Sequence, residues 1–236
     1  MATFVLVHGA FHGGWCWRDF SPFLEALGHT VLTPTLPGLG ERIGEATKDV
    51  GLSTHVADIL ALYERDDLNN TILVGHSYGG PVVGGVADAI HEKVSTLIYL
   101  DAVIPVNGKS VLDFQFEERR QSLLAQAAGH NGWQIPPPPL SFYGIFDPDQ
   151  QAWANAECVP QPLKCFSEPS SVTGAWNNIA QKSYIRCTNP ALEYMDQFQN
   201  FAEQQADWDI YEMATGHDCM ITAPAELAEI LLKYVA

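Results

Sequence analysis

Short apolar runs alternate with helical patterns along most of this chain, and no other feature constrains its fold as much. The apolar runs are four or five residues long and rich in β-branched residues, as buried strands are. They are residues 4–7, 30–33, 71–74, 96–100, 183–187 and 209–213. The helical patterns are residues 19–27, 53–65 (with Ser53 as its expected cap), 79–90 and 224–234. This alternation predicts an α/β fold with about six mostly parallel strands and helices on both faces of the sheet.

The alternation stops between residues 106 and 182. This stretch is irregular and rich in aromatic residues, including Trp133, Trp153 and Trp176. Because a structureless loop of that length is rare in a compact domain, we predict an inserted cap of short helices over the carboxyl edge of the sheet. The chain is therefore expected to have one core, residues 1–105 and 183–236, and one cap, residues 106–182.

The charge of the chain narrows the choice of partners. Its 236 residues include 12 Lys and Arg against 28 Asp and Glu, a formal charge of −16. Nucleic acids and anionic membranes bind basic faces, so we expect neither as a partner. We expect a small-molecule substrate, apolar or aromatic, and leave a homodimer open.

No apolar run approaches the ~20 residues of a membrane span, and the N-terminus lacks the basic start of a signal peptide. The five cysteines show no CxxC or metal-ligand spacing. We therefore expect a cytoplasmic protein with reduced thiols. No metal, nucleotide or flavin motif is visible, so we expect no cofactor and no metal.

The strongest local motif is Gly75-His76-Ser77-Tyr78-Gly79. It follows a predicted strand and precedes a predicted helix, which is the setting of a nucleophile elbow. The sharp turn would lift the Ser77 hydroxyl above the sheet edge. The backbone N–H of Tyr78 would then lie at the start of the helix and could stabilise an oxyanion.

A serine nucleophile needs a base. On this fold the chain order is serine, acid, histidine, and only His217 of the eight histidines follows the last predicted strand. His217 is therefore the expected general base. His8 and His76 are expected to support the catalytic residues without taking part in the reaction. A second oxyanion donor should come from the loop after the first strand, with Ala10 preferred and Phe11 as the alternative.

Several segments together resemble one branch of the α/β-hydrolase superfamily. They are Val5-Leu6-Val7-His8-Gly9-Ala10-Phe11-His12-Gly13-Gly14-Trp15-Cys16-Trp17, Gly75–Gly80, Gly216-His217 and Ala225–Leu232. The branch contains plant methyl esterases and hydroxynitrile lyases. Ile135–Leu140 and Tyr184–Thr188 resemble its bacterial esterase-like members, some of which hydrolyse carbamates such as carbendazim. The resemblance implies an α/β-hydrolase fold, a serine-hydrolase triad and an apolar or aromatic pocket.

Two positions separate the esterases from the lyases of this branch. The lyases carry a threonine where this chain has Gly9, and a lysine directly after the catalytic histidine, where it has Asp218. Both differences favour an esterase-like protein. Asp218 also departs from the esterases, and we expect it either to recognise a polar or cationic substrate group or to cap the last helix.

The acid of the triad is a further departure. In the plant relatives it follows the next-to-last strand, but here that place reads Thr188-Asn189-Pro190-Ala191, without a carboxylate. Asp101, at the end of the strand after the nucleophile helix, would meet Ser77 at the same sheet edge, so it is the preferred acid. The alternatives are Glu193, Asp196, Asn189 as a neutral partner, or no third member.

The sequence therefore predicts a serine hydrolase that cleaves a small neutral ester, lactone or carbamate through an acyl-enzyme on Ser77. The alternatives are a lyase of the hydroxynitrile-lyase type and a non-catalytic receptor with this fold. The expected substrate-pocket residues are Phe11, Tyr78, Trp133, Asp218 and Met220.

Overall fold

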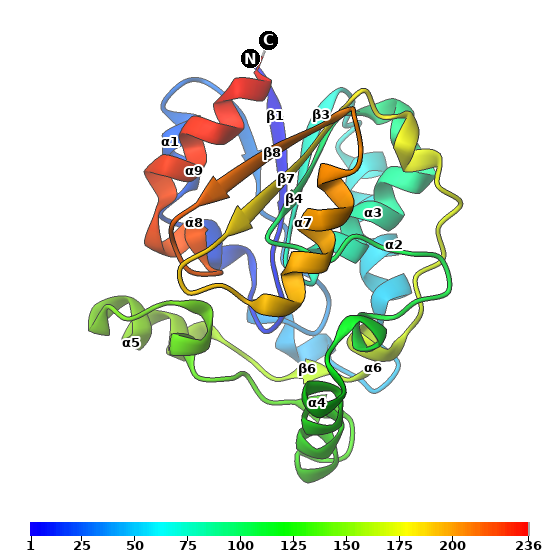
Figure 1. Cartoon of the computed structure of the whole chain (residues 1–236), viewed down its shortest axis with the longest axis vertical. Coiled ribbons are helices and arrows are strands. Elements are labelled where there is room, and N and C mark those ends of the chain that lie inside the picture. Colours follow the sequence, from blue (N-terminus) through cyan, green and yellow to red (C-terminus); the bar gives the residue numbers. More distant parts are fainter. Residues whose placement is uncertain (236) are drawn as a thin grey trace.

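A six-stranded sheet forms the centre of the molecule in the computed structural model, which describes residues 1–235 (Figure 1). Its strands lie in the order β2-β1-β3-β4-β7-β8, and every neighbouring pair is parallel. The strands are β1 (Thr3–Val7), β2 (Thr30–Leu32), β3 (Thr71–His76), β4 (Val94–Leu100), β7 (Gln181–Cys187) and β8 (Trp208–Met213). All six predicted strands and the α/β class are thus confirmed.

Helices cover both faces of this sheet, as predicted. The helices are α1 (Ser21–Glu25), α2 (Leu52–Arg65), α3 (Gly79–Ile90), α4 (Glu117–Gly129), α5 (Pro148–Glu157), α6 (Lys164–Ser167), α7 (Asp196–Glu203), α8 (Cys219–Thr222) and α9 (Pro224–Leu231). In Figure 1, α1 and α9 lie on one side of the sheet, while α2, α3 and α7 lie on the other.

The inner strands are apolar because both of their faces are covered. Every residue of β3 is buried, and so are all residues of β4 except Ser95. Strand β8, at the edge, is buried only at its two ends. The near-continuous apolar runs of the sequence are thus explained by burial between two helical layers.

Some predicted helix boundaries were wrong. Helix α2 is capped at Gly51, whose N–H donates to Oγ1 of Thr54 at 3.2 Å. Ser53 lies inside the first turn of α2, and its N–H and hydroxyl donate to the Glu168 carboxylate at 3.0 and 2.7 Å. A residue distant in the sequence therefore supplies the acceptor that Ser53 was expected to provide. Helix α7, between β7 and β8, was not predicted.

Residues 106–182 contain α4, α5 and α6 and a small antiparallel pair, β5 (Gln134–Ile135) with β6 (Gln161–Pro162). These elements lie beyond the carboxyl ends of the sheet strands (Figure 1). The end of the segment is bonded to the core at Asp88 of α3, whose carboxylate accepts from the N–H groups of Thr173 and Gly174 at 2.6 and 2.8 Å. The segment is therefore packed onto the core.

No helix among residues 1–235 is long and apolar enough to cross a membrane. The five cysteines are free thiols. The cytoplasmic location and the homodimer stay predictions.

Candidate active site

Ser77 lies on a sharp turn between β3 and α3. Its φ is +53°, a conformation that non-glycine residues rarely adopt and that is frequent at functional sites. The flanking glycines allow the turn: a Cβ at Gly75 would collide with the Val83 side chain, and one at Gly79 would lie 2.7 Å from the Val7 carbonyl oxygen. The strand–turn–helix setting expected from the motif is present, with Ser77 at 8% exposure.

Asp101 and His217 are brought together at the carboxyl edge of the sheet. Asp101 directly follows β4, and its Oδ2 lies 2.6 Å from Nδ1 of His217. Both residues are at most 1% exposed. The second ring nitrogen of His217, Nε2, has no hydrogen-bond partner within residues 1–235. The geometry thus leaves this nitrogen free to exchange a proton.

Arg186, on β7, holds the other oxygen of Asp101. Its Nη1 donates to Oδ1 of Asp101 at 2.7 Å, and the Cys187 N–H donates to the same oxygen at 3.2 Å. Burial alone would lower the pKa of Arg186, but the nearby charges of Asp101 and Asp196 raise it. Both carboxylate oxygens of Asp101 are therefore occupied.

Arg186 was not predicted as a site residue, although the sequence contains a signal for it. A charged residue within an otherwise apolar strand is rarely buried without a partner, and this arginine is only 1% exposed.

The alternative acids do not contact His217. Asp196 accepts from Nη2 of Arg186 at 2.6 Å. Glu193 is exposed, and the Asn189 N–H donates to the Thr215 carbonyl. Of the candidates weighed, the structure places Asp101 alone against His217.

The His217 ring lies near both the elbow and a pocket. Its centroid is 4.5 Å from that of His76, the residue before Ser77, and 5.6 Å from that of Tyr143. Nε2 of His76 donates to the His217 carbonyl oxygen at 3.0 Å. His76 therefore ties the loop that carries His217 to the turn that carries Ser77.

The Phe11 N–H, which was the alternative oxyanion donor, is already hydrogen-bonded, whereas within residues 1–235 the N–H groups of Ala10 and Tyr78 are not. The Phe11 N–H donates to Oε1 of Gln161 at 2.8 Å, and the Phe11 carbonyl accepts from the Val159 N–H at 3.0 Å. The Ala10 and Tyr78 amides take no partner in the described chain, and both residues line the pocket. Ala10 and Tyr78 are therefore the available donors, and Phe11 is not.

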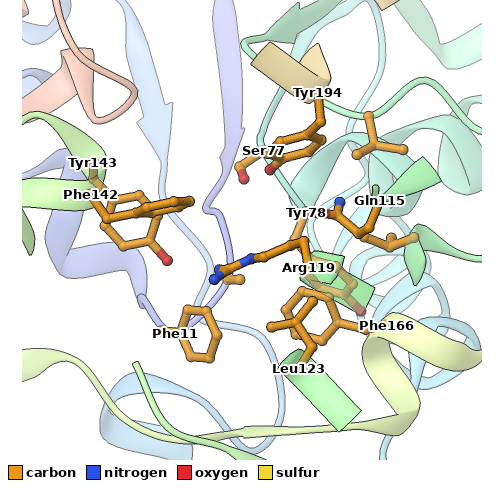
Figure 2. Close-up of a pocket in the computed structure, with 13 residues that line it drawn as sticks. Phe11, Ser77, Tyr78, Gln115, Arg119, Leu123, Phe142, Tyr143, Phe166 and Tyr194 are labelled. Atoms are coloured by element: carbon orange, nitrogen blue, oxygen red, sulfur yellow. The ribbon is translucent and has the colours of Figure 1, made fainter. Parts of the chain in front are cut away.

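The pocket is narrow, with a volume of about 40 Å³, and Ser77 lies in its wall (Figure 2). Its polar lining residues are Ser77, Tyr78, Gln115, Arg119, Tyr143 and Tyr194, and the others are Ala10, Phe11, Val103, Val111, Leu123, Phe142 and Phe166. The Tyr194 phenol lies beside the Ser77 hydroxyl, and burial raises its pKa. Most of the wall was missed because residues scattered along the chain form it.

Three of the expected pocket residues do not line this pocket. Trp133 lies in the turn before β5, where its carbonyl accepts from the Leu163 N–H at 2.7 Å. Met220 is fully buried in α8. Asp218 is also fully buried. Of the five expected pocket residues, Phe11 and Tyr78 are in its wall.

Asp218 has neither of its expected roles. It makes no side-chain capping bond to α8, and its Oδ2 lies 3.1 Å from Nε2 of His12. Burial alone would raise the pKa of Asp218, but the nearby His12, His76 and His217 lower it. Burial would likewise lower the pKa of His12, and Asp218 raises it. The two side chains form a buried ion pair.

His76, His217 and Asp218 each offer one atom within a span of 4.8 Å, the spacing of a metal site. Their side chains are already engaged by His217 O, Asp101 and His12, respectively. We therefore treat the three as a hydrogen-bonded support for the loop.

Comparison with known proteins places this chain among characterised relatives. Residues 4–230 match the family described as "Alpha/beta hydrolase family". The chain is 38% identical over 240 residues to the carbendazim hydrolyzing esterase of Nocardioides sp. (strain SG-4G), covering 98% of both chains. It is 35% identical over 251 residues to salicylic acid-binding protein 2 of Nicotiana tabacum, covering 98% of this chain and 95% of the relative.

A solved structure supports the fold. An extracellular alpha/beta-hydrolase from a Paenibacillus species superposes with a TM-score of 0.89 at 23% identity, covering 99% of each chain. The resemblance inferred from the sequence motifs is thus confirmed.

Proposed function

The chain belongs to the alpha/beta hydrolase family, and we propose that it is a serine hydrolase of small esters, lactones or carbamates with apolar or aromatic groups. The observation that carries the proposal is the 2.6 Å contact between His217 and Asp101 beside a pocket that contains Ser77. A relative named for carbendazim hydrolysis supports ester and carbamate bonds as the bonds that are cleaved.

In the first half-reaction, the Ser77 oxygen attacks the substrate carbonyl while Nε2 of His217 takes the hydroxyl proton. Asp101 holds the His217 ring in the tautomer with Nδ1–H and stabilises the imidazolium. The Ala10 and Tyr78 amides donate to the oxyanion. The carbon–oxygen bond to the leaving group then breaks, and His217 gives the proton to the departing oxygen.

In the second half-reaction, a water loses a proton to His217 and attacks the acyl carbon. The bond to the Ser77 oxygen breaks, and Ser77 recovers its proton. Apart from the substrate, the reaction consumes only water. Residues 106–182 act as a cap in this proposal, because Gln115, Arg119, Phe142 and Phe166 form part of the wall.

The pocket also suggests how the substrate enters. The pocket is narrow, and Gln115, Arg119 and Phe142 of the cap form part of its wall. We expect these side chains to move as a substrate enters.

The Gly9 backbone argues against the hydroxynitrile-lyase alternative. A Cβ there would lie 2.7 Å from Nδ1 of His76 and 3.1 Å from Cβ of Ser77. The threonine of the lyases therefore does not fit beside His76 as it is placed here.

A substrate panel tests the proposal. Aryl acetates, methyl esters, lactones and methyl carbamates, carbendazim included, are offered to the wild type and to Ser77→Ala. We expect turnover of at least one class by the wild type and a loss in kcat of about 10⁶-fold in the variant. A fluorophosphonate should label the wild type and leave Ser77→Ala unlabelled.

Other outcomes would replace the proposal. Cyanide release from mandelonitrile without ester turnover would indicate a lyase. An absence of both turnover and labelling in the folded wild type would indicate a receptor.

A further inference from the structure

Arg119 is exceptional among the arginines of this acidic chain. Arg18, Arg42, Arg65, Arg120 and Arg186 each have a carboxylate within 4.0 Å. Within residues 1–235, Arg119 has no such partner. With 28 acidic residues in the chain, an arginine left without one requires an explanation.

The Arg119 side chain points into the pocket. It extends from α4, and its guanidinium lies in the space between Ser77, Phe11 and Tyr143 (Figure 2). The guanidinium carbon is 4.8 Å from the centre of the Phe142 ring. The pocket thus holds one positive charge.

Nothing in the pocket wall neutralises this charge. The thirteen lining residues include no aspartate or glutamate. The positive charge of Arg119 acts on the Tyr143 and Tyr194 phenols, whose pKa values burial raises and Arg119 pulls back toward the ordinary value. The contact with Phe142 is a cation–π contact, which leaves the guanidinium N–H donors free for an acceptor.

We propose that Arg119 selects substrates that carry a carboxylate, and that the carboxylate binds it while the scissile carbonyl meets Ser77. This inference rests on the proposed hydrolase function and names a substrate class for the same pocket. A guanidinium binds a carboxylate through two parallel N–H bonds, a geometry that also fixes the orientation of the substrate. It replaces the neutral substrate expected from the sequence.

The charge of −16 does not oppose this binding at contact distance. Interactions between exposed charges are largely screened beyond about 8 Å at physiological ionic strength. Inside a partly dehydrated pocket the local charge of Arg119 is screened much less. The acidic surface slows the approach of an anion, whereas Arg119 sets its affinity.

Two aryl acetates of similar shape test the inference. The charged ester is 4-acetoxybenzoate and the neutral ester is 4-acetylphenyl acetate. Their kcat/KM values are compared in the wild type, Arg119→Met, Arg119→Lys and the matched control Arg120→Met, whose arginine is exposed and lies 3.9 Å from Glu117. Comparing the ratio of charged to neutral ester between variants cancels the intrinsic reactivity of each ester.

We expect Arg119→Met to lower this ratio about 10- to 100-fold, the range for a hydrogen bond to a charged group. Arg119→Lys should recover part of the loss, since it keeps the charge without the planar fork. Arg120→Met should leave the ratio unchanged. An unchanged ratio in Arg119→Met, or equal losses on both esters, would overturn the inference and leave the hydrolase proposal standing.

A binding measurement separates the inference from the failure of the proposed function. The affinity for intact 4-acetoxybenzoate is measured by calorimetry in Ser77→Ala and in Ser77→Ala/Arg119→Met. We expect the double variant to bind about 10- to 100-fold more weakly. Equal affinities would refute the role of Arg119, whether or not the wild type hydrolyses either ester.

Discussion

Two buried histidine–carboxylate pairs meet at consecutive positions of one loop, and they differ in the nitrogen atoms they leave free. His217 contacts Asp101 at 2.6 Å, and the next residue, Asp218, contacts His12 at 3.1 Å. All four side chains are at most 1% exposed. Among the residues that the structure describes, His217 bonds through Nδ1 alone. His12 bonds through Nδ1, to the Ala10 carbonyl, and through Nε2, to Asp218.

This difference separates the proposed general base from a structural cation. A histidine that donates from both nitrogens is an imidazolium, because neutral imidazole has only one N–H. The raised pKa of His12 agrees with this state. In the proposed mechanism, His217 keeps Nε2 for a proton transfer. A buried histidine–aspartate contact therefore indicates a reaction site only where one ring nitrogen remains unbonded beside a nucleophile.

The largest expected effect is on turnover at His217. Replacing His217 with Gln removes the base, and kcat for an aryl ester should fall about 10⁶-fold. The matched control is His12→Gln, which should lose far less turnover per folded molecule. Equal losses in both folded variants would erase the distinction between the two pairs.

The next effect concerns the two aspartates. Asp101→Asn retains the size of the side chain but favours the wrong His217 tautomer, so kcat should fall about 10⁴-fold. Asp218→Asn, measured on the same substrate, should keep most of its turnover per folded molecule. Near wild-type turnover in Asp101→Asn would move the acid elsewhere.

For stability the order is reversed, and the substitution at Asp218 is expected to have the large effect. Asp218→Asn leaves the buried His12 cation without its counter-charge, and the free energy of unfolding should fall by roughly 3–5 kcal/mol. Urea denaturation measures the loss, and the double variant with His12→Gln gives the coupling between the partners. Additive losses in this cycle would show that the pair contributes no interaction energy.

The smallest effect is the pH dependence of that stability. The raised pKa of His12 gives stability that is complete below about 6.5 and is lost as the pH rises through the folded-state value. The lowered pKa of Asp218 gives stability that is complete above about 3.8 and is lost as the pH falls through its folded-state value. The contribution of the pair is therefore greatest between about pH 3.8 and 6.5.

Unfolding free energies of the wild type and the His12→Gln/Asp218→Asn variant, measured across this range, should differ most inside it. A difference that does not vary with pH would show that the two groups do not titrate as a pair.

The sequence predicted what local patterns determine. Apolar runs identified all six sheet strands because both faces of the inner strands are buried. The glycines around Ser77 marked the sharp turn because a Cβ has no room there. Chain order and strand ends were enough to nominate Asp101 and His217, which the structure brings to 2.6 Å.

The features that the sequence did not predict depend on contacts between residues that are far apart in the chain. The role of Asp218 is set by His12, 206 residues earlier in the chain. Ser53 was expected to cap α2, but the acceptors at this helix start are Thr54 and Glu168. Glu168 lies 115 residues away from Ser53 in the chain. The importance of Arg119 comes from a missing partner, which no local pattern can report.

The bonds between Phe11 and residues 159–161 have a consequence for protein engineering. Phe11 has a φ of +67°, and Gln161 and Val159 bond both its N–H and its carbonyl. A chimaera that grafts a relative's segment in place of residues 106–182 would replace both residues that make these contacts. Recombination of substrate preferences within this family must therefore exchange the loop at residues 8–15 together with the segment, as one inherited block.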